Sequence, residues 1–406
     1  MKFIVLIGDG MADFPLEELG GKTPLMAAST PNMDWIAEHG RIGLVRTIPP
    51  GFPSGTEIAN MSLLGYDPAR YFTGRGPLEA ASMRVSLEAD DLAFRCNLVT
   101  LGTSGNRLIM EDFTAEHITS GEAGEIIRDI DGKMGTETIR FFPGVSYRHL
   151  MVWRDGGRRK GLADLALVPP HDIVGREISD YLPEEGGEDG VVELLTRSQD
   201  LLKDHPVNLA RREKGLRPAN SIWLWGQGRS PQLPQFRVKY GVDGGVISAV
   251  DLVKGIGVCI GFTPINVQGA TGYLNTNYRG KAEAALRGLR DHDFIFLHVE
   301  APDEAGHNAN IGEKIEAIER FDEKVVGTVL EGLKDFEDYR IMVASDHLTP
   351  IPRRTHTDEP TPFAWASKGE LESHTEGFPF SEAAARESGL FFGVGYELID
   401  SFLFGD

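Results

Sequence analysis

Three hydrophobic runs that lie far apart in the chain each end in acidic or imidazole side chains. The runs cover residues 3–7, 294–299 and 341–344 and are rich in β-branched and aromatic residues. Continuous runs of this kind are typical of parallel strands buried on both faces. Directly after them come Asp9, Asp303, His307, Asp346 and His347. Ligands bind at the carboxyl edge of an open parallel sheet, so three adjacent strands would gather these groups into one cluster. His356 follows soon after and can join it.

The alternation of strand-like and helical segments predicts an α/β core built from residues 1–86 and 240–406. The segment 311–333 is the clearest helix and should cover the sheet. Its apolar stripe consists of Ile311, Ile315, Ile318, Phe321, Val325 and Val329, and the other faces carry Glu313, Lys314, Glu316, Glu319 and Glu323.

Residues 87–239 follow a different pattern. Their strands are shorter, glycine and proline turns are frequent, and charged runs occupy residues 155–160 and 184–189. We therefore expect a separate, smaller α+β domain inserted into the core, with one sheet assembled from the chain on both sides of the insertion.

Composition excludes several classes of partner. The 406 residues carry a formal charge of −20, with 41% apolar residues. Such an acidic chain is not expected to bind nucleic acid or an anionic membrane. No run is long enough to span a bilayer, and the opening MKFIVLIGDG is too short for a signal peptide, so we expect a cytoplasmic protein. Cys96 and Cys259 belong to no CxxC spacing and are interpreted as buried thiols.

The mixture of carboxylates and imidazoles indicates the kind of metal. These ligands suit Mn²⁺, Zn²⁺ or Fe²⁺, whereas Mg²⁺ prefers oxygen and water, so we expect manganese or zinc, with magnesium as a further alternative. Six candidate ligands exceed the needs of one ion. Two ions about 4 Å apart would form the pair that polarises a phosphoryl group and activates an oxygen nucleophile.

The segment 52–60 offers candidates for that nucleophile. Ser54 and Thr56 flank Gly55 ahead of a helix-compatible stretch. Thr56 can be explained as a simple helix cap, but a helix amino terminus also stabilises a phosphoryl anion.

Other polar residues are weaker candidates. Arg75, Arg148, Arg229 and Lys281 lie near possible clefts, although each could be an ordinary solvated charge. The pair His171 and Asp172 could transfer a proton or simply form a loop turn. The GKT of residues 21–23 lacks the preceding strand of a P-loop, so no nucleotide site is predicted.

Several motifs in order resemble one known family. They are IGDGMAD, GTEIANMSLLGYDP, YFTGRGPLEAA, WGQG, GATGYLNTNY, HVEAPDEAGH, ASDH and HTDEPTPF. Over essentially the whole chain, they are similar to the archaeal-type cofactor-independent phosphoglycerate mutases of the alkaline phosphatase superfamily. Bacterial members of this group have also been labelled proposed homoserine kinases.

The resemblance implies an alkaline phosphatase-like core that binds two divalent ions of the Mn²⁺ type, and an inserted substrate-binding domain. Asp303, His307 and His356 would hold one ion, and Asp9, Asp346 and His347 the other. Relatives usually have a serine directly before an acid as the nucleophile. The aligned residue here is Thr56 before Glu57, which related phosphodiesterases also use, and Ser54 is the second choice.

The implied reaction interconverts 3-phosphoglycerate and 2-phosphoglycerate through a phosphoenzyme. His171 or Asp172 would move the proton, Lys281 and Arg229 would neutralise the transferring group, and Arg75 and Arg148 would bind substrate. The partner is thus a small phosphorylated molecule, and no oligomeric state is predicted. A homoserine kinase-like phosphotransferase, a metallophosphatase and a metal-binding protein without activity are the alternatives.

Overall fold

The computed structural model describes residues 1–183, 190–373 and 377–405, so the predicted charged run 184–189 lies outside it. The chain forms two compact units. The larger contains Met1–Phe72 and Gln232–Asp406, and the smaller contains Thr73–Pro231. This division lies at residues 72/73 and 231/232, whereas the sequence prediction placed the boundaries at 86/87 and 239/240.

Packing explains the two shifted boundaries. Helix α5 (Arg75–Ser82) packs on strands β3 (Leu92–Ser104) and β7 (Ser221–Gly228) and so belongs to the smaller unit. Helix α9 (Phe236–Tyr240) belongs to the core, because the ring of Phe236 lies 4.8 Å from Phe262 and 5.0 Å from Phe294. Turn-forming residues in the linkers therefore do not mark the boundaries between the two units.

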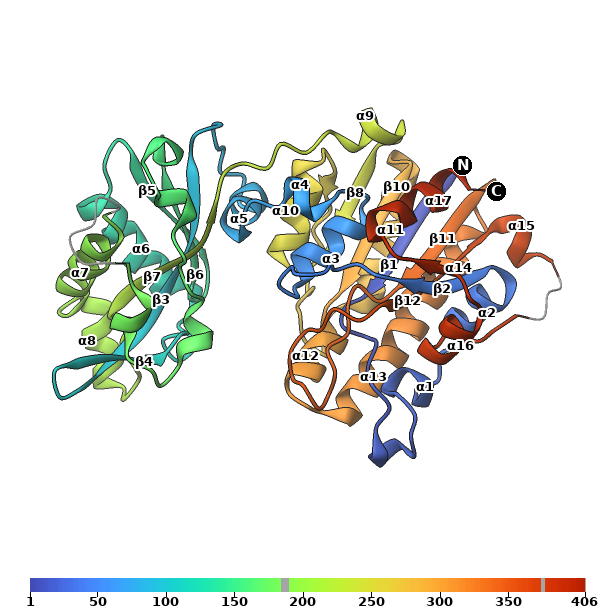
Figure 1. Cartoon of the computed structure of the whole chain (residues 1–406), viewed down its shortest axis with the longest axis horizontal. Coiled ribbons are helices and arrows are strands. Elements are labelled where there is room, and N and C mark those ends of the chain that lie inside the picture. Colours follow the sequence, from blue (N-terminus) through green and yellow to red (C-terminus); the bar gives the residue numbers. More distant parts are fainter. Residues whose placement is uncertain (184–189, 374–376, 406) are drawn as a thin grey trace. The chain divides into compact units, whose positions relative to one another are not determined.

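The larger unit is built on an eight-stranded, mainly parallel sheet (Figure 1), which confirms the α/β prediction. Only β12 runs antiparallel to its neighbours. In spatial order the strands are β13 (Phe391–Phe392), β2 (Arg41–Val45), β12 (Thr361–Ser367), β11 (Tyr339–Ala344), β1 (Lys2–Gly8), β10 (Phe294–Val299), β8 (Gly244–Ile247) and β9 (Thr263–Pro264). The three strands predicted to lie side by side, β11, β1 and β10, are direct neighbours with Ile7 opposite both Ala344 and His298.

Helices cover both faces of this sheet. Ile4, Leu6 and Ile295 point into a core shared with α2, α11, α13 and α14, whereas Phe3 on the other face meets Phe402 of α17 at a ring distance of 5.8 Å. The helices of the unit are α1 (Pro24–Ala27), α2 (Pro31–His39), α3 (Thr56–Leu63), α4 (Pro68–Tyr71), α10 (Asp251–Cys259), α11 (Tyr278–Asp291), α12 (Ala301–His307), α13 (Ile311–Phe321), α14 (Gly327–Leu333), α15 (Lys368–Leu371), α16 (Glu382–Glu387) and α17 (Leu398–Phe404). Burial of β1 on both faces is the reason for its unbroken apolar run.

The helix predicted over residues 311–333 is present but not uniform. A π-helical turn, η6 (Asp322–Val326), separates α13 from α14. Within it, the buried carboxylate of Asp322 accepts hydrogen bonds from the backbone N–H groups of Asn32 (3.1 Å) and Met33 (2.7 Å). It thus caps the amino terminus of α2, whose own cap residue Thr30 makes no such bond.

Lys314 of α13 departs from the predicted helical pattern. It was expected on a polar face, yet it is fully buried. Its Nζ donates to Asp13 Oδ2 (2.7 Å) and to the carbonyl oxygens of Thr349 (2.8 Å) and Ala12 (3.3 Å). A buried ammonium group is tolerated here because every proton has an acceptor.

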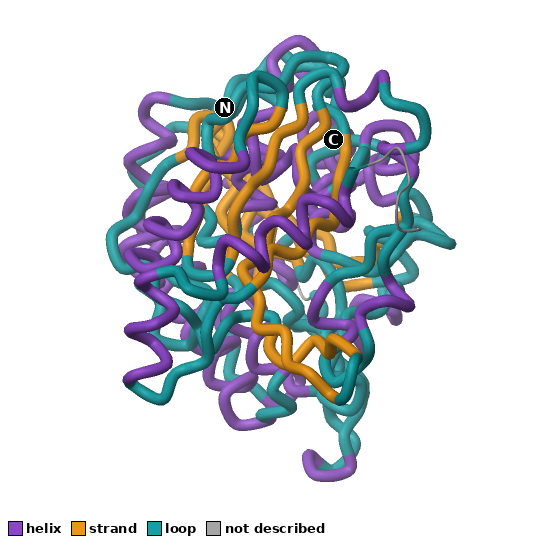
Figure 2. Tube along the Cα trace, turned by 90° about the vertical axis from the view of Figure 1, so that its left-hand side faces the viewer, coloured by secondary structure: helices purple, strands orange, loops and turns teal. Residues whose placement is uncertain are grey.

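The smaller unit is an antiparallel sheet with helices packed against it. Figure 2 shows the strands of the chain in orange and its helices in purple. This agrees with the α+β expectation. Strand β3 is central and pairs with β4 (Arg107–Asp112), β6 (Arg148–Trp153) and β7, and β6 also pairs with β5 (Ile139–Val145). Helices α6 (Ser120–Met134), α7 (Val191–Leu202) and α8 (Pro206–Glu213) supply one side of its core, and α5 packs against β3, β6 and β7.

Both cysteines are free, with Cys96 buried and Cys259 partly buried. Among the helices of the described ranges, none has the length and apolar character that crossing a bilayer requires.

Candidate metal centre and active site

The carboxyl ends of three adjacent strands carry the acidic and imidazole residues that the sequence singled out. Asp9 follows β1, Asp346 and His347 follow β11, and α12 begins just after β10 and presents Asp303 and His307 one helical turn apart. His356 lies in the loop between β11 and β12. All six residues come together in one largely buried cluster of the larger unit.

One part of the cluster is centred on Asp303. Its Oδ2 lies 3.3 Å from His307 Nε2, and its Oδ1 lies 3.3 Å from His356 Nε2. The two ring nitrogens are 3.0 Å apart, and His307 Nδ1 lies 3.0 Å from the carbonyl oxygen of Arg354, which orients the ring. One carboxylate and two imidazoles therefore point at a common region.

The contacts around Asp303 shift the pKa values of its residues. Burial alone would raise the pKa of Asp303, but the hydrogen bonds with His307 and His356 outweigh it and hold this pKa well below the usual value. Burial lowers the pKa of His307, yet Asp303 more than compensates and raises it to about 9. His307 Nε2 faces the Asp303 carboxylate, an environment that favours a positive charge on this ring.

The second part contains Asp9, Asp346 and His347. His347 Nε2 lies 3.3 Å from Asp9 Oδ1 and 3.7 Å from Asp346 Oδ2. Asp346 is held by the backbone N–H of Gly10 (3.1 Å) and by Asn60 Nδ2 (2.7 Å). The His347 ring lies 4.2 Å from the His356 ring between centroids, so the two parts adjoin.

The carboxylate of Asp9 tests whether this arrangement fits metal ions. Asp9 is completely buried, and neither of its oxygens has a hydrogen-bond partner in the described parts of the chain. Burial together with the nearby Asp346 and Asp303 carboxylates raises its pKa well above the usual value. A buried anion among other anions is costly unless a cation joins it. The orphaned oxygens and the mixed oxygen and nitrogen donors therefore fit divalent ions.

Thr56 is the hydroxyl that the fold brings to the cluster. It is the first residue of α3, is 9% exposed, and places its Oγ1 3.2 Å from His347 Nε2. One turn later, Asn60 bonds both the Thr56 carbonyl (2.8 Å) and Asp346. Ser54 is half-buried in the preceding loop and has no hydrogen bond to the cluster among the described residues. The local geometry therefore favours Thr56 over Ser54 as the nucleophile.

Lys281 of α11 adds a cation beside the second part. It is fully buried, and its Nζ donates to the carbonyl oxygen of His298 (3.1 Å). Burial lowers its pKa to about 8, although the Glu300 and Asp9 carboxylates act in the opposite direction.

In the smaller unit, two of the predicted arginines lie around a buried third one. Arg75 and Arg95 lie over the indole of Trp225, at 5.6 and 4.3 Å from its centroid. Arg95 pairs with Glu79 at 2.8 Å, yet its buried Nε has no hydrogen-bond partner in the described ranges. Burial lowers the pKa of Arg95, Glu79 acts in the opposite direction, and the nearby Arg75 and Arg148 lower it further.

The remaining candidates of the smaller unit occupy more exposed positions. His171 and Asp172 lie on a short 3₁₀ helix, η4 (Pro170–Ile173), with His171 Nε2 3.6 Å from Asp172 Oδ1. The His171 ring meets the Trp225 ring at 5.6 Å, next to the arginines. The guanidinium of Arg229 donates instead to the carbonyl oxygen of Gly157.

Three site residues escaped the sequence reasoning. His298 interrupts the apolar run FIFLHV, which was a visible signal, and its Nε2 lies 3.2 Å from Asp9 Oδ2. The only sequence signal for Asn60 was its position one helical turn after Thr56. Arg95 lies in an otherwise strand-like stretch. The functions of Asn60 and Arg95 depend on contacts across the fold that no local pattern reveals.

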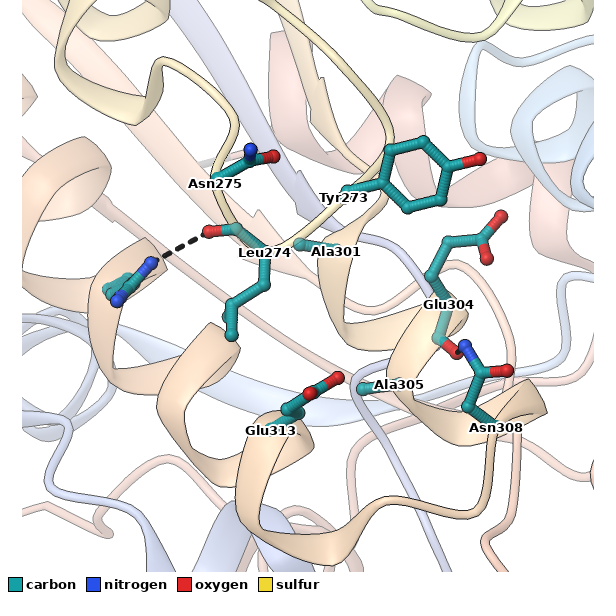
Figure 3. Close-up of a pocket in the computed structure, with 9 residues that line it drawn as sticks. Tyr273, Leu274, Asn275, Ala301, Glu304, Ala305, Asn308 and Glu313 are labelled. Carbon is teal, nitrogen blue, oxygen red and sulfur yellow. Dashed lines mark hydrogen bonds between the residues drawn. The ribbon is translucent and has the colours of Figure 1, made fainter.

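A cavity of about 470 Å³ adjoins a different face of α12 (Figure 3). Ala301, Glu304, Ala305 and Asn308 form its helical wall, and Tyr273 stands opposite. Asp303 and His307 do not line it, so this cavity is separate from the donor cluster.

Family models and named proteins match this chain over most of its length. Residues 37–208 match the family model described as 2,3-bisphosphoglycerate-independent phosphoglycerate mutase, and residues 180–367 match that of type I phosphodiesterase / nucleotide pyrophosphatase. A Geobacter sulfurreducens protein named probable 2,3-bisphosphoglycerate-independent phosphoglycerate mutase is 51% identical, covering 99% of this chain and 100% of its own. A Methanosarcina barkeri protein named as such a mutase is also 51% identical, covering 96% of both chains.

Two solved structures share the fold over nearly the whole length. A protein from Pyrococcus horikoshii is 31% identical with a TM-score of 0.81, covering 99% of this chain and 96% of its own. The cofactor-independent phosphoglycerate mutase from Thermoplasma acidophilum is 27% identical with a TM-score of 0.64, covering 99% of both chains.

Proposed function

The chain belongs to the family of 2,3-bisphosphoglycerate-independent phosphoglycerate mutases, and on that premise we propose that it interconverts 3-phosphoglycerate and 2-phosphoglycerate through a phosphoenzyme. The observation that carries this proposal is the 51% identity over 99% of the chain to a relative named as such a mutase. The cluster around Thr56 is suited to phosphoryl transfer, because a hydroxyl lies beside side chains that can bind divalent ions.

Two divalent ions, Mn²⁺ by the donor set, would be held by six residues of the larger unit. Asp303, His307 and His356 would hold one, and Asp9, Asp346 and His347 the other. When bound, such a pair neutralises phosphoryl charge and makes a nearby hydroxyl more acidic. Zn²⁺ or Mg²⁺ are the alternatives.

The chain's own residues carry the transfer. Thr56 Oγ1 gives its proton to water and attacks the phosphorus of 3-phosphoglycerate, so that a bond from Oγ1 to phosphorus forms and the bond from phosphorus to the substrate's 3-oxygen breaks. A general acid, His171 or Asp172, would protonate the released 3-oxygen. Glycerate then turns, and its 2-hydroxyl gives its proton to the same group and attacks the phosphorus on Thr56. The bond from Oγ1 to phosphorus breaks, and Oγ1 recovers a proton from water. Lys281 and Arg229 would offset the charge of the transferring group.

A group of arginines supports a carboxylate site in the smaller unit. Arg95 pairs with Glu79, and Arg75 and Arg148 lie close enough to Arg95 to lower its pKa. The carboxylate of glycerate would bind among these guanidinium groups, and Trp225 would hold two of their planes in place. Holding glycerate by this end leaves its two hydroxyls free to exchange places.

Arg148 is exposed, so Arg148→Ala tests this carboxylate site without leaving a buried charge that has lost its counter-ion. KM for 3-phosphoglycerate should rise by about 10- to 100-fold, the size of one charge-assisted hydrogen bond of about 1.5–3 kcal/mol, with a smaller change in kcat. Steady-state kinetics measures both constants. Arg107→Ala removes an exposed arginine of β4 in the same unit and should leave KM unchanged. An unchanged KM for Arg148→Ala would remove this residue from the substrate site.

The reaction itself is tested by a direct assay. Protein stripped of metal and reloaded with Mn²⁺ should convert 3-phosphoglycerate to 2-phosphoglycerate with no 2,3-bisphosphoglycerate added, and the metal-free protein should not. Release of inorganic phosphate without 2-phosphoglycerate would favour a metallophosphatase instead. Phosphorylation of homoserine by ATP would favour the kinase-like alternative.

A further inference from the structure

His298 is a fully buried histidine at the end of β10 that the proposed function does not use. The side chains of Ile295, Leu297 and Val299 fill the core on one face of the sheet, and His298 belongs to the opposite face. A buried imidazole needs a partner for each ring nitrogen. The two nitrogens of His298 find very different surroundings.

The Nδ1 atom faces a neutral hydroxyl. It lies 3.4 Å from Ser248 Oγ, just after β8, and this oxygen also accepts the backbone N–H of Val250 at 2.9 Å. A serine oxygen can accept two hydrogen bonds, so it can also accept one from the N–H of Nδ1. That tautomer leaves the lone pair on Nε2.

The Nε2 atom faces two carboxylates. It lies 3.2 Å from Asp9 Oδ2 and 3.8 Å from Asp346 Oδ2, and it has no hydrogen-bond partner among the described residues. One donor atom each from Asp9, His298 and Asp346 all lie within 4.8 Å of one another. Donors that share one ion at about 2.1 Å lie up to about 4.2 Å apart, so small side-chain movements would let all three reach it.

From this convergence we infer that His298 is a further ligand of the ion proposed at Asp9 and Asp346, oriented through Nδ1 by Ser248. The inference rests on the proposed two-ion site. A metal-bound histidine usually donates its other ring N–H to an oxygen of a carboxylate, a backbone carbonyl or water, and Ser248 Oγ supplies an oxygen at that position here. With His347, the site would contain two imidazoles and two carboxylates, which favours Mn²⁺, Co²⁺ or Zn²⁺ over Mg²⁺.

Metal binding to the full chain tests this ligand directly. Equilibrium dialysis with Co²⁺ should find two ions on the natural protein. In His298→Gln one ion should stay tight, whereas the second should bind at least about 100-fold more weakly, with a changed visible Co²⁺ spectrum. His307→Ala should instead weaken the ion at Asp303. Ser248→Ala keeps the imidazole and should weaken the second ion by about 10-fold at unchanged stoichiometry.

Electron spin-echo spectroscopy of the natural protein gives an answer that needs no variant. With ¹⁵N-labelled histidine and Mn²⁺, both ions should couple to two imidazole nitrogens, those of His307 and His356 at one ion and those of His298 and His347 at the other. A single coupled imidazole nitrogen at the second ion would overturn the inference. A His298→Gln protein with two ions, unchanged affinity and an unchanged Co²⁺ spectrum would overturn the inference and leave the two-ion proposal intact. Failure of the natural protein to bind any ion would overturn both.

Discussion

Thr56→Val should reduce mutase turnover by about 10⁴-fold or more, the loss expected when a catalytic nucleophile is removed. Valine keeps the branched shape of threonine, so α3 and its contacts should persist. Asn60 reaches Asp346 from the next turn and bonds only the backbone of Thr56, so both ions should still bind. The measurement combines turnover with elemental analysis, and protein incubated with ³²P-labelled 3-phosphoglycerate should retain no label.

Two further variants control this prediction. Thr56→Ser keeps a hydroxyl at the first position of α3 and should retain measurable turnover and labelling. Ser54→Ala should have only a mild effect, because Ser54 lies in the preceding loop without a described hydrogen bond to the donors. The opposite pattern, with Thr56→Val active and Ser54→Ala inactive, would transfer the role of nucleophile to Ser54.

The second large effect is expected on stability. Lys314→Met should lower the free energy of unfolding of the larger unit by about 3–5 kcal/mol, because it leaves the Asp13 carboxylate buried without its counter-ion. Two carbonyl oxygens, from Ala12 and Thr349, also lose their donor. Urea denaturation and hydrogen exchange of the β1 and β11 amides would measure the change.

The same helical segment provides a matched control. Lys324 lies on the exposed side of η6, so Lys324→Met should change stability by less than about 0.5 kcal/mol. The double variant Lys314→Met with Asp13→Asn removes both charges and should recover part of the loss. An equally stable Lys314→Met protein would show that the buried pair is dispensable.

The Lys314 pair also links the two loops that carry metal-type residues. Asp13 lies in the loop after Asp9, and Thr349 lies two residues after His347. The ammonium group joins both loops to α13, and the Asp13 carboxylate accepts the backbone N–H of Ile351 as well. Both loops can therefore hold their acids at fixed positions although neither has regular structure.

The local sequence determined the plan of the protein. Short apolar runs rich in β-branched and aromatic residues favour strands buried on both faces, and acids placed just after neighbouring parallel strands meet at one edge of the sheet. This reasoning predicted the adjacency of β1, β10 and β11 and the gathering of the six acids and histidines. It also selected the segment containing Thr56, where a helix begins directly after a glycine.

Tertiary structure alone decided which polar residues depart from their local pattern. Lys314 repeats with its glutamate neighbours on the polar side of a helix, yet the loops after β1 and β11 cover it and supply its acceptors. Arg95 lies in β3 but meets Glu79 of the preceding helix α5 and Trp225 of β7, which is distant in the sequence. The boundary at Phe72 likewise follows from where α5 packs. Burial of a charge depends on partners brought from distant segments, and helical or strand periodicity carries no information about those partners.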